Sequence, residues 1–178
     1  MSEPESRSIG VTDAAIDASK AILVECLEDV EYWPLEIDGF VDIGPGFART
    51  YRKCIEAWEQ VLRDPGDEQF HRLRKWTKYH WYQVRILERL CKQELRERRE
   101  RLRKLQVDLG DAHDLYSLQT ILLSKAEPDM LLLERAIARK HELYADALKQ
   151  GEGVFATSVD DLVARCAAWW VEWHQQGP

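Results

Sequence analysis

The segment Phe70–Ile86, FHRLRKWTKYHWYQVRI, constrains the fold of this chain more than any other part of the sequence. It holds five Lys or Arg residues and two His residues, and it lacks Asp and Glu. At about 100° per residue, its apolar members fall on one side of a helix. These are Leu73, Trp76, Val84 and, just beyond the segment, Leu87, with Thr77 and His80 among them. The spacing therefore predicts an amphipathic helix, in which His80 is a core or groove residue.

The opposite side of this predicted helix is basic. Its residues follow the i, i+3/i+4, i+7 series of a helical stripe, and we call them the basic stripe. They are His71, Arg74, Lys75, Lys78, Tyr82 and Arg85. The row is roughly 20 Å long at 1.5 Å per residue, and its like charges repel by a few tenths of a kcal/mol per pair. A linear polyanion lying along the row would offset that repulsion.

The charge of the whole chain has the opposite sign to that of the stripe. Its formal net charge is -7, so the basic segment is a local inversion of sign. Such an inversion usually marks a site for an anion, and a solvated face without a ligand is the alternative interpretation. The acidic total charge disfavours nucleic acid as the ligand.

Composition is that of a soluble globular protein. The 178 residues are 45% apolar and 32% charged, which suits one domain or one large bundle. No apolar run approaches the roughly 18 residues of a membrane span. The first residues, MSEPESRSIGV, lack the basic-then-apolar order of a signal peptide. We therefore expect a cytoplasmic protein with no membrane partner.

The four cysteines are far apart and form no CxxC pair. They are Cys26, Cys54, Cys91 and Cys166. This spacing predicts reduced, mostly packed thiols and no zinc site.

Glycine and proline divide the chain into helical segments, and no strand pattern lies between them. Residues 1–10 are expected to be a flexible terminus, and residues 11–178 a single domain. The predicted helices cover residues 12–31, 47–63, 68–90, 92–109, 111 onward, 128–150 and 158–174. The fourth is either separate from the third or its kinked continuation. Short connections favour antiparallel neighbours, so the predicted fold is all-α, an up-and-down bundle of long helices.

Several boundaries of these helices depend on single residues. A loop containing Pro45 is expected to precede the helix that begins at Phe47. Gly110 is expected to end the fourth helix, with Asp111 as the N-cap of the fifth. Gly151 and Gly153 are expected to break the sixth helix.

Three further groups of residues are candidates for a site. Arg49, Arg52 and Lys53 either complete a cationic wall or are ordinary surface residues, because Glu56 lies among them. A second basic run contains Arg96, Arg98, Arg99, Arg101, Arg103 and Lys104. Glu97 and Glu100 interrupt this run and a heptad of leucines underlies it, so it is interpreted as structural, with Arg98, Arg101 or Lys104 as outer contacts.

The pair His113-Asp114 has two interpretations. It is either a metal-binding or catalytic pair, or the first turn of a helix after Gly110. The second is favoured because Asp114 would then oppose the helix dipole.

Three segments resemble one known family in the right order. His71-x-x-Arg74-Lys75-x-x-Lys78 followed by Trp81-Tyr82 resembles the signature helix of the CHAD domain (conserved histidine α-helical domain). The run LRKLQVDLGDAHDLYSLQTIL and the stretch WPLEIDGF followed by GFARTYRKC resemble later and earlier segments of that family. Together they cover roughly residues 30 to 125. The chain has one signature helix and resembles the C-terminal half of the family.

The resemblance implies a function. CHAD domains bind inorganic polyphosphate through basic helix faces without catalysis, and often accompany triphosphate-handling enzymes. We therefore expect a non-enzymatic polyphosphate-binding protein, without cofactor or metal, whose site is the basic stripe with Arg49, Arg52 and Lys53. A triphosphate-handling enzyme is an expected partner, and polyphosphate granules are an expected location.

Other functions and an assembly remain open at this point. The alternatives are an enzyme or accessory subunit that acts on polyphosphate or triphosphate, and a module that binds an acidic protein or nucleic acid. A chain with one signature helix has the option of pairing two-fold with a second copy. The tryptophan-rich end AAWWVEWHQQ offers apolar surface for packing or for this homodimer.

Overall fold

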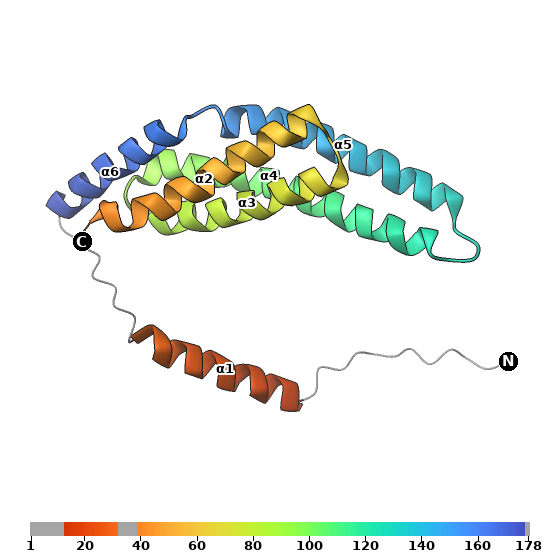
Figure 1. Cartoon of the computed structure of the whole chain (residues 1–178), viewed down its shortest axis with the longest axis horizontal. Coiled ribbons are helices and arrows are strands. Elements are labelled where there is room, and N and C mark those ends of the chain that lie inside the picture. Colours follow the sequence, from red (N-terminus) through yellow and green to blue (C-terminus); the bar gives the residue numbers. More distant parts are fainter. Residues whose placement is uncertain (1–12, 32–38, 177–178) are drawn as a thin grey trace. The chain divides into compact units, whose positions relative to one another are not determined.

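The computed structural model describes residues 13–31 and 39–176, and the part of the chain that it describes is helical without strands. The helices are α1 (Asp13–Glu31), α2 (Phe40–Arg63), α3 (Asp67–Leu87), α4 (Lys92–Leu123), α5 (Met130–Val154) and α6 (Val159–Gln176) (Figure 1). The all-α prediction is confirmed. None of the described helices has the length and apolar character needed to cross a membrane.

The chain divides into two compact units, Met1–Glu36 and Ile37–Pro178. The first unit contains α1, which confirms the helix predicted near residues 12–31. The side chains described on α1 are exposed, apolar ones included. The prediction of a single domain over residues 11–178 stays a prediction, and the terminus predicted over residues 1–10 lies outside the described residues.

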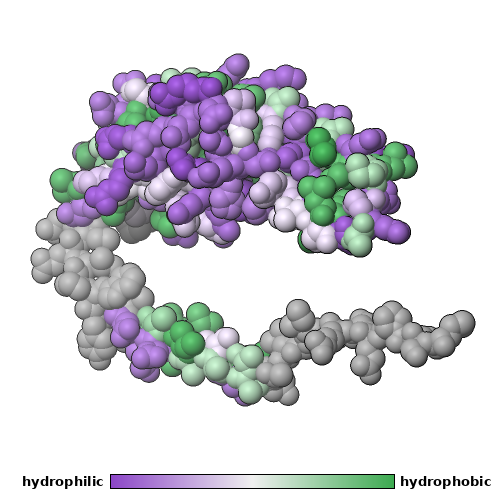
Figure 2. Space-filling model, turned by 45° about the vertical axis from the view of Figure 1, so that its right-hand side comes forward, coloured by the Kyte–Doolittle hydropathy of each residue, from purple (hydrophilic) through white to green (hydrophobic). Residues whose placement is uncertain are grey.

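The second unit is a bundle in which α3 packs against α2 and α4, α5 packs against α4, and α6 packs against α2. The α4–α5 hairpin projects beyond α2 and α3, and apolar residues gather at its tip (Figures 1 and 2). Helix α6 continues in the direction of α5 instead of folding back on it (Figure 1). The prediction that successive helices pack antiparallel is therefore wrong for α5 and α6.

The core of the bundle lies between α2, α3 and α4. Tyr51, Leu73 and Leu102 are each 0% exposed, and so is His80, as the sequence predicted for a core histidine. The Tyr51 hydroxyl donates to the Thr157 carbonyl at 2.7 Å, which ties the core to the α5–α6 connection. These contacts fix which face of α3 points inward.

Helix α2 begins at Phe40, so the loop predicted to run up to Phe47 was wrong in this part. Phe40 is buried, and its ring centroid lies 6.2 Å from that of Trp170 on α6. The Asp42 carboxylate accepts the Gly39 backbone N–H at 3.2 Å, which caps the first turn. Burial and capping thus outweigh the hydrogen bond that Pro45 cannot donate.

Helix α3 ends at Leu87 instead of Leu90. A turn follows, in which the Leu90 N–H donates to the Leu87 carbonyl at 2.9 Å. Cys91 then has the extended backbone of an N-cap. The turn makes α4 a separate helix and not a continuation of α3.

Helix α4 runs through Gly110 without interruption, so the predicted stop at Gly110 and cap at Asp111 were wrong. The Arg74 side chain of α3 packs over this position, since a methyl group at Gly110 would lie at an ordinary contact distance of 3.8 Å from its Nε. Glycine in a helix interior costs about 0.5–1 kcal/mol relative to alanine, which packing against α3 and α5 can offset.

Helix α5 also continues through its two glycines, contrary to the predicted break, and ends at Val154. Gly151 is buried against Trp58 of α2, and a methyl group there would overlap the indole ring. Its absence lets α5 approach α2. The predicted last helix is confirmed, with the Ser158 hydroxyl accepting the Asp161 N–H at 3.1 Å.

Candidate functional site

Helix α3 has the two faces that its sequence predicted. The buried face carries Phe70, Leu73, Thr77, His80, Val84 and Leu87. On the basic stripe, His71, Lys75, Lys78, Tyr82 and Arg85 are exposed, and Arg74 is half-buried. The stripe is therefore a continuous, solvent-facing row on one helix.

The cations of the stripe have no carboxylate partners. Within residues 39–176, no ion pair involves Arg74, Lys75, Lys78 or Arg85, whereas nine other Lys or Arg residues there have acidic partners. Arg72 lies on the same helix outside the stripe, and its Nη2 is 3.2 Å from the Glu68 carboxylate. On α3, therefore, Arg72 outside the stripe is paired, whereas the Lys and Arg residues of the stripe are not.

Two cations of the stripe make cation–π contacts with tryptophan rings of the same helix. Nζ of Lys75 lies 5.6 Å from the ring centroid of Trp76, and Cζ of Arg85 lies 5.7 Å from that of Trp81. Cation–π contacts of this kind orient the side chain and leave its charge and N–H donors available to a ligand.

Helix α4 adds a second histidine to the stripe. The ring centroids of His71 and His113 are 4.7 Å apart, because α4 runs antiparallel beside α3. His113 and Asp114 lie inside α4, so their interpretation as a first helical turn was wrong. Sequence reasoning missed His113 as a stripe neighbour because it placed a stop at Gly110. A continuous helix would have brought residue 113 opposite residue 71.

The setting of His71 favours its neutral form in the free protein. Its pKa lies below the ordinary value of 6.5, first because the ring is partly desolvated, and then because His113, Arg74 and Lys75 carry or can carry positive charge. A bound anion would reverse the electrostatic part of this effect and promote protonation.

Arg74 is the least exposed cation of the stripe. Its Nε is buried against α4 and has no hydrogen-bond partner among the described residues. The guanidinium therefore has donor capacity that the bundle itself does not use. A guanidinium can bind two oxygens of one phosphate group.

The candidates on α2 divide into paired and unpaired residues. Arg49, Arg52 and Lys53 are all exposed. Nζ of Lys53 lies 2.6 Å from the Glu56 carboxylate, whereas the structure records no ion pair for the two arginines. Their assignment to the site stays a prediction.

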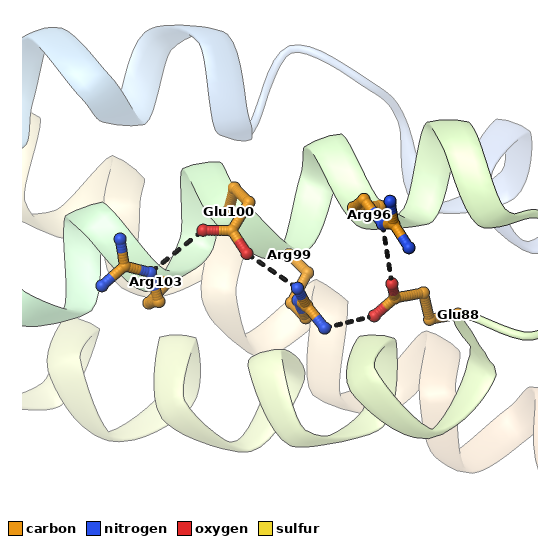
Figure 3. Close-up of polar contacts among 5 residues, drawn as sticks. All are labelled: Glu88, Arg96, Arg99, Glu100 and Arg103. Carbon is orange, nitrogen blue, oxygen red and sulfur yellow. Dashed lines mark hydrogen bonds and ion pairs between the residues drawn. The ribbon is translucent and has the colours of Figure 1, made fainter.

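Three of the six cations of the second basic run, on α4, are paired with carboxylates (Figure 3). Glu88, in the turn after α3, lies 3.3 Å from Arg96 and 2.6 Å from Arg99. Glu100 lies 2.8 Å from Arg99 and 3.0 Å from Arg103. Hydrogen bonds from Arg99 and Arg103 lower the pKa of Glu100, so it is ionised at neutral pH. The structural interpretation of this run agrees with the geometry for these three arginines.

The part of the chain that the structure describes has no cluster of three or more His, Cys, Asp or Glu residues placed to hold a metal ion. The cysteines are free thiols, with Cys54 and Cys166 buried. Burial raises the pKa of each of these two thiols to about 12.

Comparison with known proteins gives one match. A family model described as the CHAD domain matches residues 37–123. No curated protein and no solved structure matches the chain. The CHAD domain is associated with polyphosphate- and triphosphate-related proteins. The matched residues span α2, α3 and α4, and they include the basic stripe and His113. Residues 37–123 of this chain are therefore similar to the CHAD domain.

Proposed function

We propose that this protein binds inorganic polyphosphate along the basic stripe of α3, without catalysing a reaction. The observation that carries the proposal is a row of exposed cations without carboxylate partners, on one face of one helix, in a chain of net charge -7. A flexible, unbranched polyanion suits such a row better than a compact ligand. Similarity of residues 37–123 to the CHAD domain supports the same ligand class.

Each stripe residue has a role that follows from its chemistry. Arg74 grips phosphate oxygens with its fork of N–H donors, while Lys75 and Lys78 act as point charges. His71 gains a proton as phosphates approach, and the His113 ring lies beside it, with the two centroids 4.7 Å apart. The Tyr82 hydroxyl donates a hydrogen bond from the same face. Binding releases counterions and therefore weakens steeply with salt.

The test is a calorimetric titration with long-chain polyphosphate at low and moderate salt. The Arg74→Glu and Lys75→Glu variants are expected to lose binding while their helicity, measured by circular dichroism, is unchanged. Arg72→Gln is the matched control, because Arg72 lies on α3 outside the stripe and is paired with Glu68. Unchanged affinity in both stripe variants would sink the proposal.

The ligand class is tested separately from the site. We expect an oligonucleotide of matched charge to compete poorly with polyphosphate, whose unhindered phosphates follow the row more closely. Equal competition would instead favour the interpretation as a general polyanion or acidic-partner module. Phosphate release in a colorimetric assay with added divalent metal would revive the enzymatic alternative.

A homodimer that joins two stripes is part of the same proposal. The tryptophan-rich end of α6 is already used within the bundle, since Trp170 packs against Phe40. A dimer would therefore use another surface, and the apolar tip of the α4–α5 hairpin is one that remains exposed. A monomer by light scattering at micromolar concentration would remove this part of the proposal.

A further inference from the structure

Arg98 of α4 is a half-buried cation whose polar partners are neutral. Its Nε and Nη2 each lie 3.2 Å from Nε2 of His80. Its guanidinium carbon lies 4.5 Å from the ring centroid of Tyr51. Burial, and next the charge of Arg98 itself, hold the pKa of His80 well below 6.5, so this ring is uncharged. Tyr51 contributes only its π face.

No nearby group supplies a compensating negative charge. Arg98 belongs to no ion pair between residues 39 and 176. The thiols of Cys54 and Cys166 feel its charge, yet burial raises the pKa of each to about 12, so both stay protonated. Charges removed from water are normally paired, and an unpaired one points to a missing ligand or ion.

Arg98 lines a cavity of about 180 Å³ between α4, α5 and α6. Arg101 follows it on α4, and Arg165 faces it from α6. Gly153 of α5 leaves space on the remaining side, where a methyl group would meet nothing within 4 Å. Guanidinium groups thus approach this cavity from two helices, and none of the basic-stripe residues lines it.

The carboxylates of the cavity do not cancel this charge. Glu94 and Glu97 line it as well, both on exposed positions of α4. Glu94 is 3.8 Å from Arg165, at the limit of an ion pair, and it forms no ion pair with Arg98. Three guanidinium groups against two carboxylates leave one net positive charge, and neither Arg98 nor Arg101 has an ion pair within residues 39–176.

We propose that this cavity binds a compact oxyanion of the phosphate type, either inorganic phosphate or the phosphate group of a monoester. Arg98 is oriented in advance by His80 and Tyr51, so its free N–H groups are fixed toward the cavity. The cavity of about 180 Å³ has room for one tetrahedral anion, which guanidinium groups of α4 and α6 can approach from two sides. The site is independent of polyphosphate binding by the stripe.

The experiment is a titration of the full chain with inorganic phosphate and, in parallel, with phenyl phosphate, each without polyphosphate. We expect binding of at least one ligand, and a loss of at least about tenfold in the Arg101→Gln/Arg165→Gln double variant. Both side chains are exposed, so this variant should keep the wild-type melting temperature. Preference between the two ligands identifies the source of the phosphate group.

Two controls separate this site from the others. Arg139→Gln removes an exposed arginine that is paired with Glu142 on α5, and phosphate affinity should not change. The Lys75→Glu/Lys78→Glu variant should also keep phosphate affinity, even where it loses polyphosphate. Absence of binding at millimolar phosphate, an unchanged affinity in the Arg101→Gln/Arg165→Gln variant, or a loss in the stripe variant would overturn the proposal.

Discussion

The basic stripe of α3 and the arginine run of α4 are both rich in cations, yet three of the six cations of the run are paired with carboxylates, whereas no Lys or Arg of the stripe is paired within the described residues. On α4, Arg96, Arg99 and Arg103 share the carboxylates of Glu88 and Glu100 (Figure 3). On α3, Arg74, Lys75, Lys78 and Arg85 have no such partners within the described residues. The difference teaches that cation content alone does not define an anion site. What matters is which carboxylates the fold brings within reach.

The ion pairs of α4 contribute little to stability, because exposed pairs typically give about 0.2–1 kcal/mol. Their effect on binding is larger, since a polyanion must displace a carboxylate before it gains an arginine. The stripe presents no such competitor. Four predictions test this contrast.

The largest effect is expected from neutralising equal charge on the two surfaces. Lys75→Gln with Lys78→Gln should weaken polyphosphate binding on the order of 100-fold, because each lysine makes a charge-assisted contact. Arg96→Gln with Arg103→Gln should change the affinity by less than about threefold, because those charges are already paired. Calorimetry at several salt concentrations measures both, and equal losses would abolish the contrast.

The second prediction turns the paired surface into an unpaired one. Glu88→Gln with Glu100→Gln frees three arginines beside the stripe and should tighten polyphosphate binding about tenfold at low salt, with a steeper salt dependence. Glu142→Gln, which unpairs only Arg139 on α5, is the control. No gain in affinity would mean that ion pairing is not what prevents the α4 arginines from binding polyphosphate.

The third prediction concerns pH. The pKa of His71 lies below 6.5 in the free protein, and a bound polyanion raises it, so binding takes up a proton. Affinity should therefore increase as pH falls from about 8 to 6, by up to roughly tenfold for each pKa unit gained. His71→Gln should reduce this slope. The Glu88→Gln/Glu100→Gln variant should keep it, since it adds no group that titrates in this range.

The smallest effect is expected where the stripe rests on α4. Gly110→Ala should raise the free energy of unfolding by about 0.5–1 kcal/mol, as expected for alanine in a helix interior. The new methyl group would lie 3.8 Å from Nε of Arg74, an ordinary contact, so polyphosphate affinity should be preserved. Chemical denaturation and calorimetry test the two parts. A marked drop in affinity would mean that the position of Arg74 matters as much as its charge.

The sequence predicted those features that depend on neighbours within one helix. The two faces of α3 follow from a period of three to four residues, and burial of Leu73 and His80 matches it. The helix predicted over residues 158–174 also follows from local chemistry, since the Ser158 hydroxyl caps its first turn.

Features that depend on contacts between helices were not predictable in the same way. The start of α2 is stabilised by Phe40 packing on Trp170, and the continuation of α5 through Gly151 by the close contact with Trp58. The pairing of Arg99 with Glu88 likewise joins residues from two elements. A glycine or proline read in isolation indicates a break, and only the packed neighbour reveals why the helix continues.

The stripe comes from one uninterrupted helix, and this has a consequence for the length of ligand it selects. His71 and Arg85 are separated by about 21 Å at 1.5 Å per residue, a spacing that the rigid backbone does not adjust. A phosphate oligomer shorter than this leaves cations at one end unoccupied. Affinity per molecule should therefore rise with oligomer length until the ligand spans the helix face, and then level off.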